Sequence, residues 1–352
     1  MNFSLPRNMD HWILEDAPRN EVVVSSRARL ARNLPHLPFA AHAGEDKLGE
    51  IAQRVHAAFR ANGELGPYAG YELGALEQPV RTLLRESHLI STEQEKGGIG
   101  RMVYLSPAMD TSVMVNEEDH LRLSTLVSGL RIGEAYSRIN RLEEVVEKRL
   151  EMAYSEEFGY LTACPTNTGT GLRLSVMLHM PALAMVGQIE ESLGNLNNYG
   201  LIVRGAYGEH TENLGDMFQI SNEITLGKSE RQIMQTLEKV VRQVIDREMR
   251  TRELLLKDAR EKVEDAVCRA LGILASARQM TSAEAATLLS RTRLGVAQDW
   301  GMPLGHAELN RLFVQIQPAH LRFNQGADDD PDKRDLVRAD YLRSIFRTNG
   351  QH

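Results

Sequence analysis

The chain of 352 residues has very little cysteine, no long apolar run and no large excess of either charge. Cys164 and Cys268 are too few for a disulfide framework, which favours a reducing compartment. No apolar run reaches the roughly 18 residues of a membrane-spanning helix. The first residues, MNFSLPRNMDHW, lack the apolar segment of a secretion signal. We therefore predict a cytoplasmic protein without a membrane partner.

The balance of charge also bears on the class of partner. The 41 basic and 48 acidic residues give a net charge of −7, so long-range electrostatics give no reason to expect direct binding of nucleic acid. Apolar residues make up 42% of the chain and charged residues 25%, which is typical of a folded protein with a sizeable core. The length suits two domains.

The pattern of apolar residues changes along the chain. Four β-like runs, EVVVSS, GRMVYLS, TSVMVN and GLIVRG, are interspersed with helical stretches in the first two-thirds. From about Lys228 onward nearly every segment has helical spacing, and Thr281 to Glu284 has the capping-box pattern that opens a helix. We place a boundary near Asp258, and we predict one domain over 1–258 and a helical domain over 259–352.

Four short segments crowd charged and polar residues against β-like sequence, and the first two supply arginines and carboxylates. In SSRARLARN, Arg27 and Arg29 are two residues apart, so in a strand both side chains point to one face. A planar guanidinium group can bind two phosphate oxygens at once, although a solvated edge strand would show the same pattern. In NEEDHLR, three carboxylates, a histidine and Arg122 closely follow an apolar run.

The other two segments have the composition of loops. CPTNTGTGLR, from Cys164 to Arg173, is a turn whose backbone N–H groups can approach phosphates, but it lacks the ending of a P-loop. RGAYGEHTE has Arg204 at its base and Glu209 and Glu212 further on, as in a loop that closes over a substrate. An ordinary loop and a solvated hairpin are open alternatives. Together, however, the segments combine arginines for a polyphosphate with carboxylates for a cationic acceptor, as phosphoryl transfer requires.

In order and nearly letter for letter, these segments resemble the catalytic motifs of the phosphagen (guanidino) kinases, and NEEDHLR is among the most specific of them. QISNEITLG continues the resemblance. The resemblance implies an α+β fold, with a mainly antiparallel sheet flanked by helices, followed here by the all-helical domain. It also implies ATP as the phosphate donor, with Mg²⁺ bound through the nucleotide and no dedicated metal site on the protein.

The resemblance assigns roles to individual residues. Glu118 would hold the acceptor guanidinium group and act as the base, Cys164 would lie beside that group, and Glu209 or Glu212 would supply a second carboxylate. A guanidinium group is a poor nucleophile because its lone pairs are delocalised, but two carboxylates can orient it and accept its proton as the N–P bond forms. The implied ATP-binding residues, with His88 on the adenine side, are Ser25, Ser26, Arg27, Arg29, His88, Arg122, Arg173, Met177, Arg204 and Glu209.

The chain differs from the small-molecule guanidino kinases at both ends, and these differences point to a particular group within the family. Only about twenty residues precede the first arginine motif, where small-molecule guanidino kinases have a helical domain of about a hundred residues, so we expect an open acceptor site. The helical tail has no counterpart in those enzymes, and this layout resembles the bacterial protein-arginine kinases. Its segment RDLVRA resembles their phosphoarginine-binding motif, although an ordinary amphipathic helix is the alternative. The implied ligands are Arg334, Asp335, Arg338 and Ala339.

The leading hypothesis is an ATP-dependent protein-arginine kinase, allosterically controlled, that marks proteins for stress-related quality control and degradation. The alternatives are a kinase of free guanidino compounds and a phosphoarginine-binding adaptor without catalysis. The resemblance implies four kinds of partner: protein substrates with exposed arginines, a second copy in a homodimer or larger assembly, a zinc-binding activator protein and an AAA+ protease.

Overall fold

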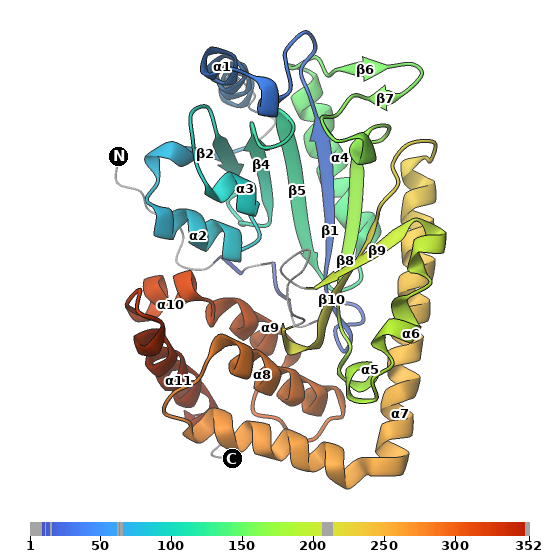
Figure 1. Cartoon of the computed structure of the whole chain (residues 1–352), viewed down its shortest axis with the longest axis vertical. Helices are drawn as coiled ribbons and strands as arrows, with labels where there is room; N and C mark the ends of the chain where they lie inside the picture. The colour runs from blue at the N-terminus through green and yellow to red at the C-terminus, as the bar shows by residue number, and fades with distance from the viewer. Residues whose placement is uncertain are drawn as a thin grey trace.

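The computed structural model describes residues 9–10, 12–14, 16–61, 63, 66–205 and 214–348. A sheet with its flanking helices occupies the upper part of Figure 1, and the C-terminal helices lie below it. Among the helices of these residues, none is both long enough and apolar enough to cross a membrane.

The sheet has eight strands in the order β2-β3-β4-β5-β1-β8-β10-β9, and every neighbouring pair is antiparallel. This arrangement confirms the predicted α+β class. A separate hairpin pairs β6 with β7. The strands are β1 (Val23–Arg32), β2 (Ala69–Glu72), β3 (Met102–Leu105), β4 (Thr111–Val115), β5 (Leu121–Ser128), β6 (Tyr154–Ser155), β7 (Gly159–Tyr160), β8 (Leu172–His179), β9 (Leu201–Gly205) and β10 (Met217–Asn222).

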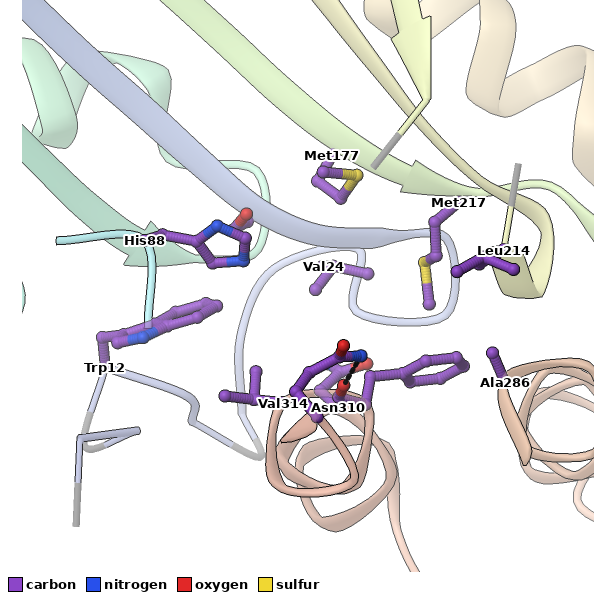
Figure 2. Close-up of a pocket in the computed structure, with 12 residues that line it drawn as sticks. Trp12, Val24, His88, Met177, Leu214, Met217, Ala286, Asn310 and Val314 are labelled. Atoms are coloured by element: carbon purple, nitrogen blue, oxygen red, sulfur yellow. Dashed lines mark hydrogen bonds between the residues drawn. The ribbon is translucent and has the colours of Figure 1, made fainter. Parts of the chain in front are cut away.

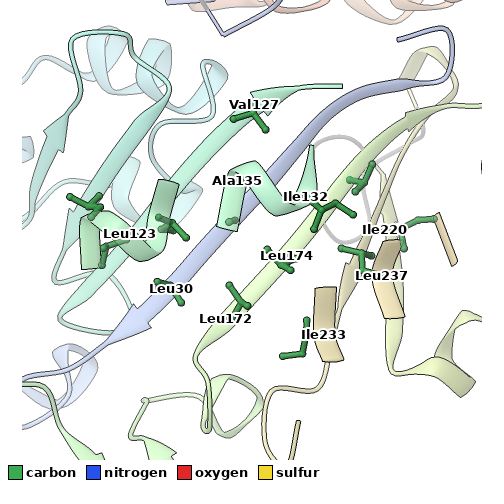
Figure 3. Packing of buried hydrophobic residues seen from close by; sticks show 14 of the residues in the cluster. Leu30, Leu123, Val127, Ile132, Ala135, Leu172, Leu174, Ile220, Ile233 and Leu237 are labelled. Atoms are coloured by element: carbon green, nitrogen blue, oxygen red, sulfur yellow. The ribbon is translucent and has the colours of Figure 1, made fainter. Parts of the chain in front are cut away.

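Alternation along the central strand β1 separates an apolar face from a charged face. Leu30 lies opposite Leu123 of β5 and Leu172 of β8, and all three are buried. Directly opposed residues share one face of a sheet, so these leucines form a continuous apolar surface. Figure 3 shows this surface packed against side chains of α4 (Ile132–Glu147) and of the first half of α7. The other face of β1 carries Arg27 and Arg29.

The remaining helices cover both faces of the sheet toward β3 and β4. Helix α1 (Glu45–Ala61) packs on the apolar face, whereas α2 (Gln78–Glu86) packs over β3 and β4 on the opposite face. The other short elements of this part are α3 (Thr92–Glu95), α5 (Pro181–Met185), α6 (Ile189–Leu193), η1 (Ala40–His42), η3 (Leu73–Ala75), η4 (Pro165–Asn167), η5 (Leu196–Tyr199) and η6 (Leu214–Asp216).

Helix α7 (Glu230–Ser276) leads from the sheet to the C-terminal helices. It begins at a capping box formed by Ser229 and Gln232, and its backbone departs from helical geometry at Ala259 (φ −150°, ψ 38°). In Figure 1 its second half turns beneath the sheet. The kink falls beside the expected boundary at 258, although the division into two domains stays a prediction.

The C-terminal helices surround a core of their own, which includes Leu274, Leu289, Leu309 and Leu342. The Thr281 hydroxyl accepts a hydrogen bond from the Glu284 N–H (3.1 Å), as expected for a helix start. These helices are α8 (Ser282–Ala297), α9 (His306–Gln315), α10 (Pro318–Gln325) and α11 (Pro331–Thr348).

Candidate active site

Four of the five predicted arginines come together on three neighbouring strands because of the strand register. Arg29 of β1 lies directly opposite Arg173 of β8, and Arg122 of β5 lies opposite Ala31 of β1. Arg27 shares the face of Arg29 because it is two residues away. All four side chains are partly buried. We call this surface, with Arg204 of β9, the arginine face.

Arg29 lies close to the positive charges of the other four arginines of the arginine face. Burial lowers its pKa well below the usual value for arginine, and the positive charges of Arg27, Arg122, Arg173 and Arg204 lower it further. Its Nε–H is buried without a hydrogen-bond partner in the part of the chain that the structure describes. Like charges held this close destabilise the fold, and a bound polyanion would relieve the repulsion.

In the segment NEEDHLR, most of the charged and polar side chains form hydrogen bonds that hold the loop in place. Both carboxylate oxygens of Glu117 accept hydrogen bonds from Arg122 Nη1 (2.8 Å at Oε1 and 2.6 Å at Oε2), which fixes that guanidinium group on the arginine face. Asp119 accepts hydrogen bonds from Asn33 Nδ2 (2.6 Å) and the backbone N–H of Ala163 (2.7 Å). His120 is fully buried and receives the Leu34 N–H at Nδ1 (3.0 Å). These three side chains fasten the loop.

Glu118 is the carboxylate of this segment that is exposed to solvent. Its side chain has no hydrogen-bond or ion-pair partner among residues 9–205 and 214–348 that the structure describes. Desolvation by the surrounding protein raises its pKa above the usual glutamate value, and the charges of Asp119 and Glu117 raise it further. A rigidly held carboxylate with a raised pKa suits a general base.

The glycine-rich segment lies next to this carboxylate loop. Its fit is close at Gly171 (φ +63°), where a Cβ atom would come within 2.7 Å of the Ala31 carbonyl oxygen. The Thr225 hydroxyl ties the turn down through the carbonyl oxygens of Thr166 (2.8 Å) and Thr168 (2.6 Å). Cys164 follows Ala163, whose N–H donates to Asp119, so this hydrogen bond joins the turn that carries the predicted cysteine to the segment that carries Glu118. Its Sγ lies 3.0 Å from Thr166 Oγ1.

Three of the predicted nucleotide-binding residues line a pocket at one end of the arginine face. Ser25, His88 and Met177 all contribute to it, and Figure 2 shows His88 and Met177 pointing toward its interior. Burial and the charge of Arg27 lower the pKa of His88 to about 3, so its imidazole is neutral near pH 7. Arg27 Nη2 donates to the His88 carbonyl oxygen (2.9 Å), which links the pocket to the arginines.

Ser26 is the predicted residue that the structure does not bring to this face. It is buried on the opposite side of β1, where its hydroxyl donates to the Gly129 carbonyl oxygen (2.8 Å) and accepts the Arg131 N–H (3.0 Å). Arg32, at the other end of β1, also points away from the arginine face, into an ion pair with Glu143 of α4. Glu209 and Glu212 lie outside the described residues.

The RDLVRA segment begins near the start of α11, and its two arginines have different surroundings. Arg338 is 2% exposed and donates to the carbonyl oxygens of Ile316 (Nε, 3.0 Å) and Met280 (Nη1, 2.9 Å), and to Asp335. Arg334 is partly exposed and lines a pocket between α2 and α10–α11. Ala339 is buried in the core of the C-terminal helices. Arg338 therefore has a structural task in addition to the binding role predicted for it.

Sequence reasoning missed the residues that hold the site together. Asn33 was not predicted, yet its amide joins the end of β1 to Asp119 and to the backbone N–H of His120 (2.8 Å). Apart from the resemblance, nothing in the sequence distinguished Glu117 and Asp119 from Glu118. A signal was present, since each carboxylate in a buried loop needs its own partners, but the partners come from distant segments.

Comparisons with known proteins agree with this geometry. Residues 50–251 match the family model "ATP:guanido phosphotransferase, C-terminal catalytic domain", and residues 260–352 match "Protein-arginine kinase McsB C-terminal domain". The chain therefore belongs to the ATP:guanido phosphotransferase family and, within it, to the protein-arginine kinases.

Similar proteins cover almost the whole chain. The protein-arginine kinase of Symbiobacterium thermophilum is 43% identical over 346 residues, which are 97% of this chain and 98% of that protein. The protein-arginine kinase of Halothermothrix orenii is 40% identical over 338 residues, which are 96% of this chain and 97% of that protein.

Solved structures support the fold. The duplicated taurocyamine kinase of Schistosoma mansoni, with bound transition-state analogue components, has a TM-score of 0.60 at 27% identity. That match covers 66% of this chain and 34% of the duplicated kinase. A lombricine kinase has a TM-score of 0.59 at 24% identity, covering 70% of this chain and 72% of that one, which shows the fold alone.

Proposed function

We propose that this phosphotransferase is an ATP-dependent kinase that phosphorylates the guanidinium group of arginine side chains in proteins. The observation that carries the proposal is the exposed carboxylate of Glu118, which lies within reach of the charges of Arg122 and Arg173 on the arginine face. The arginines suit a triphosphate, and the carboxylate suits a cationic acceptor.

The chemistry follows from the positions of these groups. The arginine face would hold the β- and γ-phosphates and compensate the negative charge that shifts during transfer. Glu118 would accept a hydrogen bond from the acceptor guanidinium group, orient one nitrogen toward the γ-phosphorus and take up its proton. The N–P bond then forms as the bond between the γ-phosphorus and the β–γ bridging oxygen breaks, and ADP leaves.

Two parts of the site are assigned by resemblance alone. Glu209 or Glu212 would supply the second carboxylate on the acceptor, and Mg²⁺ would be bound mostly by phosphate oxygens and water. No group of three or more histidine, cysteine, aspartate or glutamate side chains is placed to bind a metal within the described residues. An ion carried by the nucleotide needs no such cage.

The RDLVRA segment is proposed as a second site, for phosphoarginine. Arg334 faces a pocket, and Asp335 lies beside it with a side chain that is only 17% exposed. A phosphoryl group would bind Arg334, and the guanidinium part of the ligand would bind the aspartate. Binding there could raise activity if the occupied state is the active one. The dimer, the zinc-binding activator, the AAA+ protease and the role in stress-related degradation are likewise inferred from the resemblance.

The function is tested by offering the enzyme two acceptors with Mg²⁺ and γ-labelled ATP. Label is expected to enter an unfolded arginine-containing protein and to be lost in acid, since the N–P bond is acid-labile. Comparable labelling of free L-arginine would favour the alternative, a kinase of free guanidino compounds. Label that survives acid and is lost in base would contradict transfer to a guanidinium group. Binding of phosphoarginine without any transfer would favour the adaptor.

A further inference from the structure

The pocket in Figure 2 has two walls that come from different parts of the chain. The upper wall contains Val24, Ser25, His88 and Met177, from the sheet and the loop after α2. The lower wall comes from α8 and α9 and includes Ala286, Asn310, Phe313 and Val314. The enclosed cavity is small, about 60 Å³, and it opens into a wider space of about 610 Å³ that includes open solvent.

The pocket lies at the distance from the arginine face at which the base of a bound nucleotide is expected. Ser25 and Arg29 share one face of β1 and are four residues apart, which is about 13 Å at a rise of about 3.3 Å per residue. That span suits an extended nucleoside triphosphate. With its phosphates on the arginines, the base would lie between the two walls.

The lining has the chemistry of a base-binding site. It is mainly apolar, with Val24, Met177, Met217, Phe313 and Val314 available to contact the faces of a flat ring. Few polar groups interrupt this surface, and they can fix the orientation of the ring through its polar edge.

One polar group is held in a defined orientation. Asn310 is 4% exposed, and its Oδ1 accepts a hydrogen bond from Arg293 Nε (2.9 Å). Arg293 is fully buried and is fixed to the sheet part of the molecule through His179 Nδ1 (2.8 Å) and the Asn20 carbonyl oxygen. With Oδ1 occupied by Arg293, Nδ2 is the group of the Asn310 side chain that is left to bind a ligand. An amino group donates hydrogen bonds, so the complementary atom on a ligand is an acceptor.

We propose that the C-terminal helices complete the nucleotide site, and that Asn310 donates from Nδ2 to an acceptor ring nitrogen of adenine. This inference rests on the proposed ATP-dependent function and deepens it. It makes Asn310 a specificity-determining residue, and it makes the C-terminal helices part of the catalytic machinery.

The experiment compares the affinities of the full-length protein for Mg-ATP and for tripolyphosphate, which has no base, by calorimetry. Asn310→Leu should weaken ATP binding about tenfold, since it removes the hydrogen bond to the base. It also removes the acceptor of Arg293 Nε, so the fold of this variant is checked by its melting temperature. Val314→Phe, which fills the pocket and leaves Asn310 intact, should weaken it at least as much. Neither variant should change the affinity for tripolyphosphate. The matched control is Asn324→Leu, the same change at an exposed position of α10 outside the pocket.

Trp12 gives an independent signal because it also lines the pocket. ATP and adenosine should change its emission and tripolyphosphate should not, and Trp300→Phe should leave the change intact. Unchanged ATP affinity in folded Val314→Phe and Asn310→Leu would overturn the base-site proposal alone, provided that the wild type still transfers phosphate. If neither ATP nor tripolyphosphate bound to the wild type, the proposed function would fail with it.

Discussion

Replacing Glu118 by glutamine keeps the size of the side chain and removes the charge that the proposed mechanism uses. Glu118 is exposed, and its side chain has no partner in the described part of the chain, so the free energy of unfolding should change by less than about 0.5 kcal/mol. Loss of a general base lowers turnover by about 10²–10⁴-fold, which is roughly 3 to 5.5 kcal/mol of transition-state stabilisation. The affinity for ATP should stay within about threefold, since the arginines are untouched.

The assay is phosphate transfer from γ-labelled ATP to an unfolded protein, with ATP affinity measured separately. Glu156→Gln, at an exposed position on the β6–β7 hairpin, serves as the matched control. The pH dependence adds a second criterion. Because the pKa of Glu118 is raised, wild-type kcat/KM should fall as the pH drops through a value above the usual glutamate range. Near-normal turnover in Glu118→Gln, or an unchanged acid limb in its residual activity, would refute its role as the base.

Three further outcomes are expected. Arg29→Met should raise the melting temperature by about 2–4 °C through relief of charge repulsion while weakening tripolyphosphate binding at least tenfold; a lower melting temperature would contradict the crowding of the arginines. Arg338→Met leaves two buried carbonyl groups without their donor and should lower the free energy of unfolding by roughly 2–4 kcal/mol, measured with denaturant. A variant as stable as the wild type would show that Arg338 does not stabilise the fold. Stability should also fall between pH 7 and pH 5. Burial lowers the pKa of His306 to about 3 and of His320 to about 4. These histidines therefore take up protons at a higher pH in the unfolded chain than in the folded one, and each lowers the free energy of unfolding by about 2 kcal/mol between pH 7 and pH 5. Burial raises the pKa of Glu86 to about 6, so this carboxylate takes up its proton in the folded chain and offsets about 1 kcal/mol of the lost stability. A constant denaturation midpoint between pH 7 and pH 5 would contradict the net loss.

The sequence predicted the parts of the fold that local patterns determine. EVVVSS, GRMVYLS, TSVMVN and GLIVRG all contribute to strands, which are β1, β3, β4 and β9. Period-two spacing also put Arg27 and Arg29 on one face, and the structure confirms it. The helical tail followed from its spacing in the same way.

Other features depend on contacts between distant segments and could not be read locally. Ser26 was grouped with Ser25, yet alternation along β1 turns it into the opposite face. The resemblance gave Arg338 a binding role, but nothing local indicated that its side chain also donates to the carbonyl oxygens of Met280 and Ile316. The C-terminal wall of the pocket in Figure 2 was not predicted, since nothing in α9 indicates which surface it covers.

The position of the transferred phosphate tests the central claim most directly. Two versions of one unfolded acceptor protein, one with its arginines intact and one with every arginine replaced by lysine, are incubated with the enzyme, Mg²⁺ and ATP. The modified residues are then located by mass spectrometry at neutral pH. The account predicts phosphate on arginine side chains of the first protein and none on the second. Equal phosphorylation of both proteins, with the phosphate on serine, threonine or lysine, would contradict it.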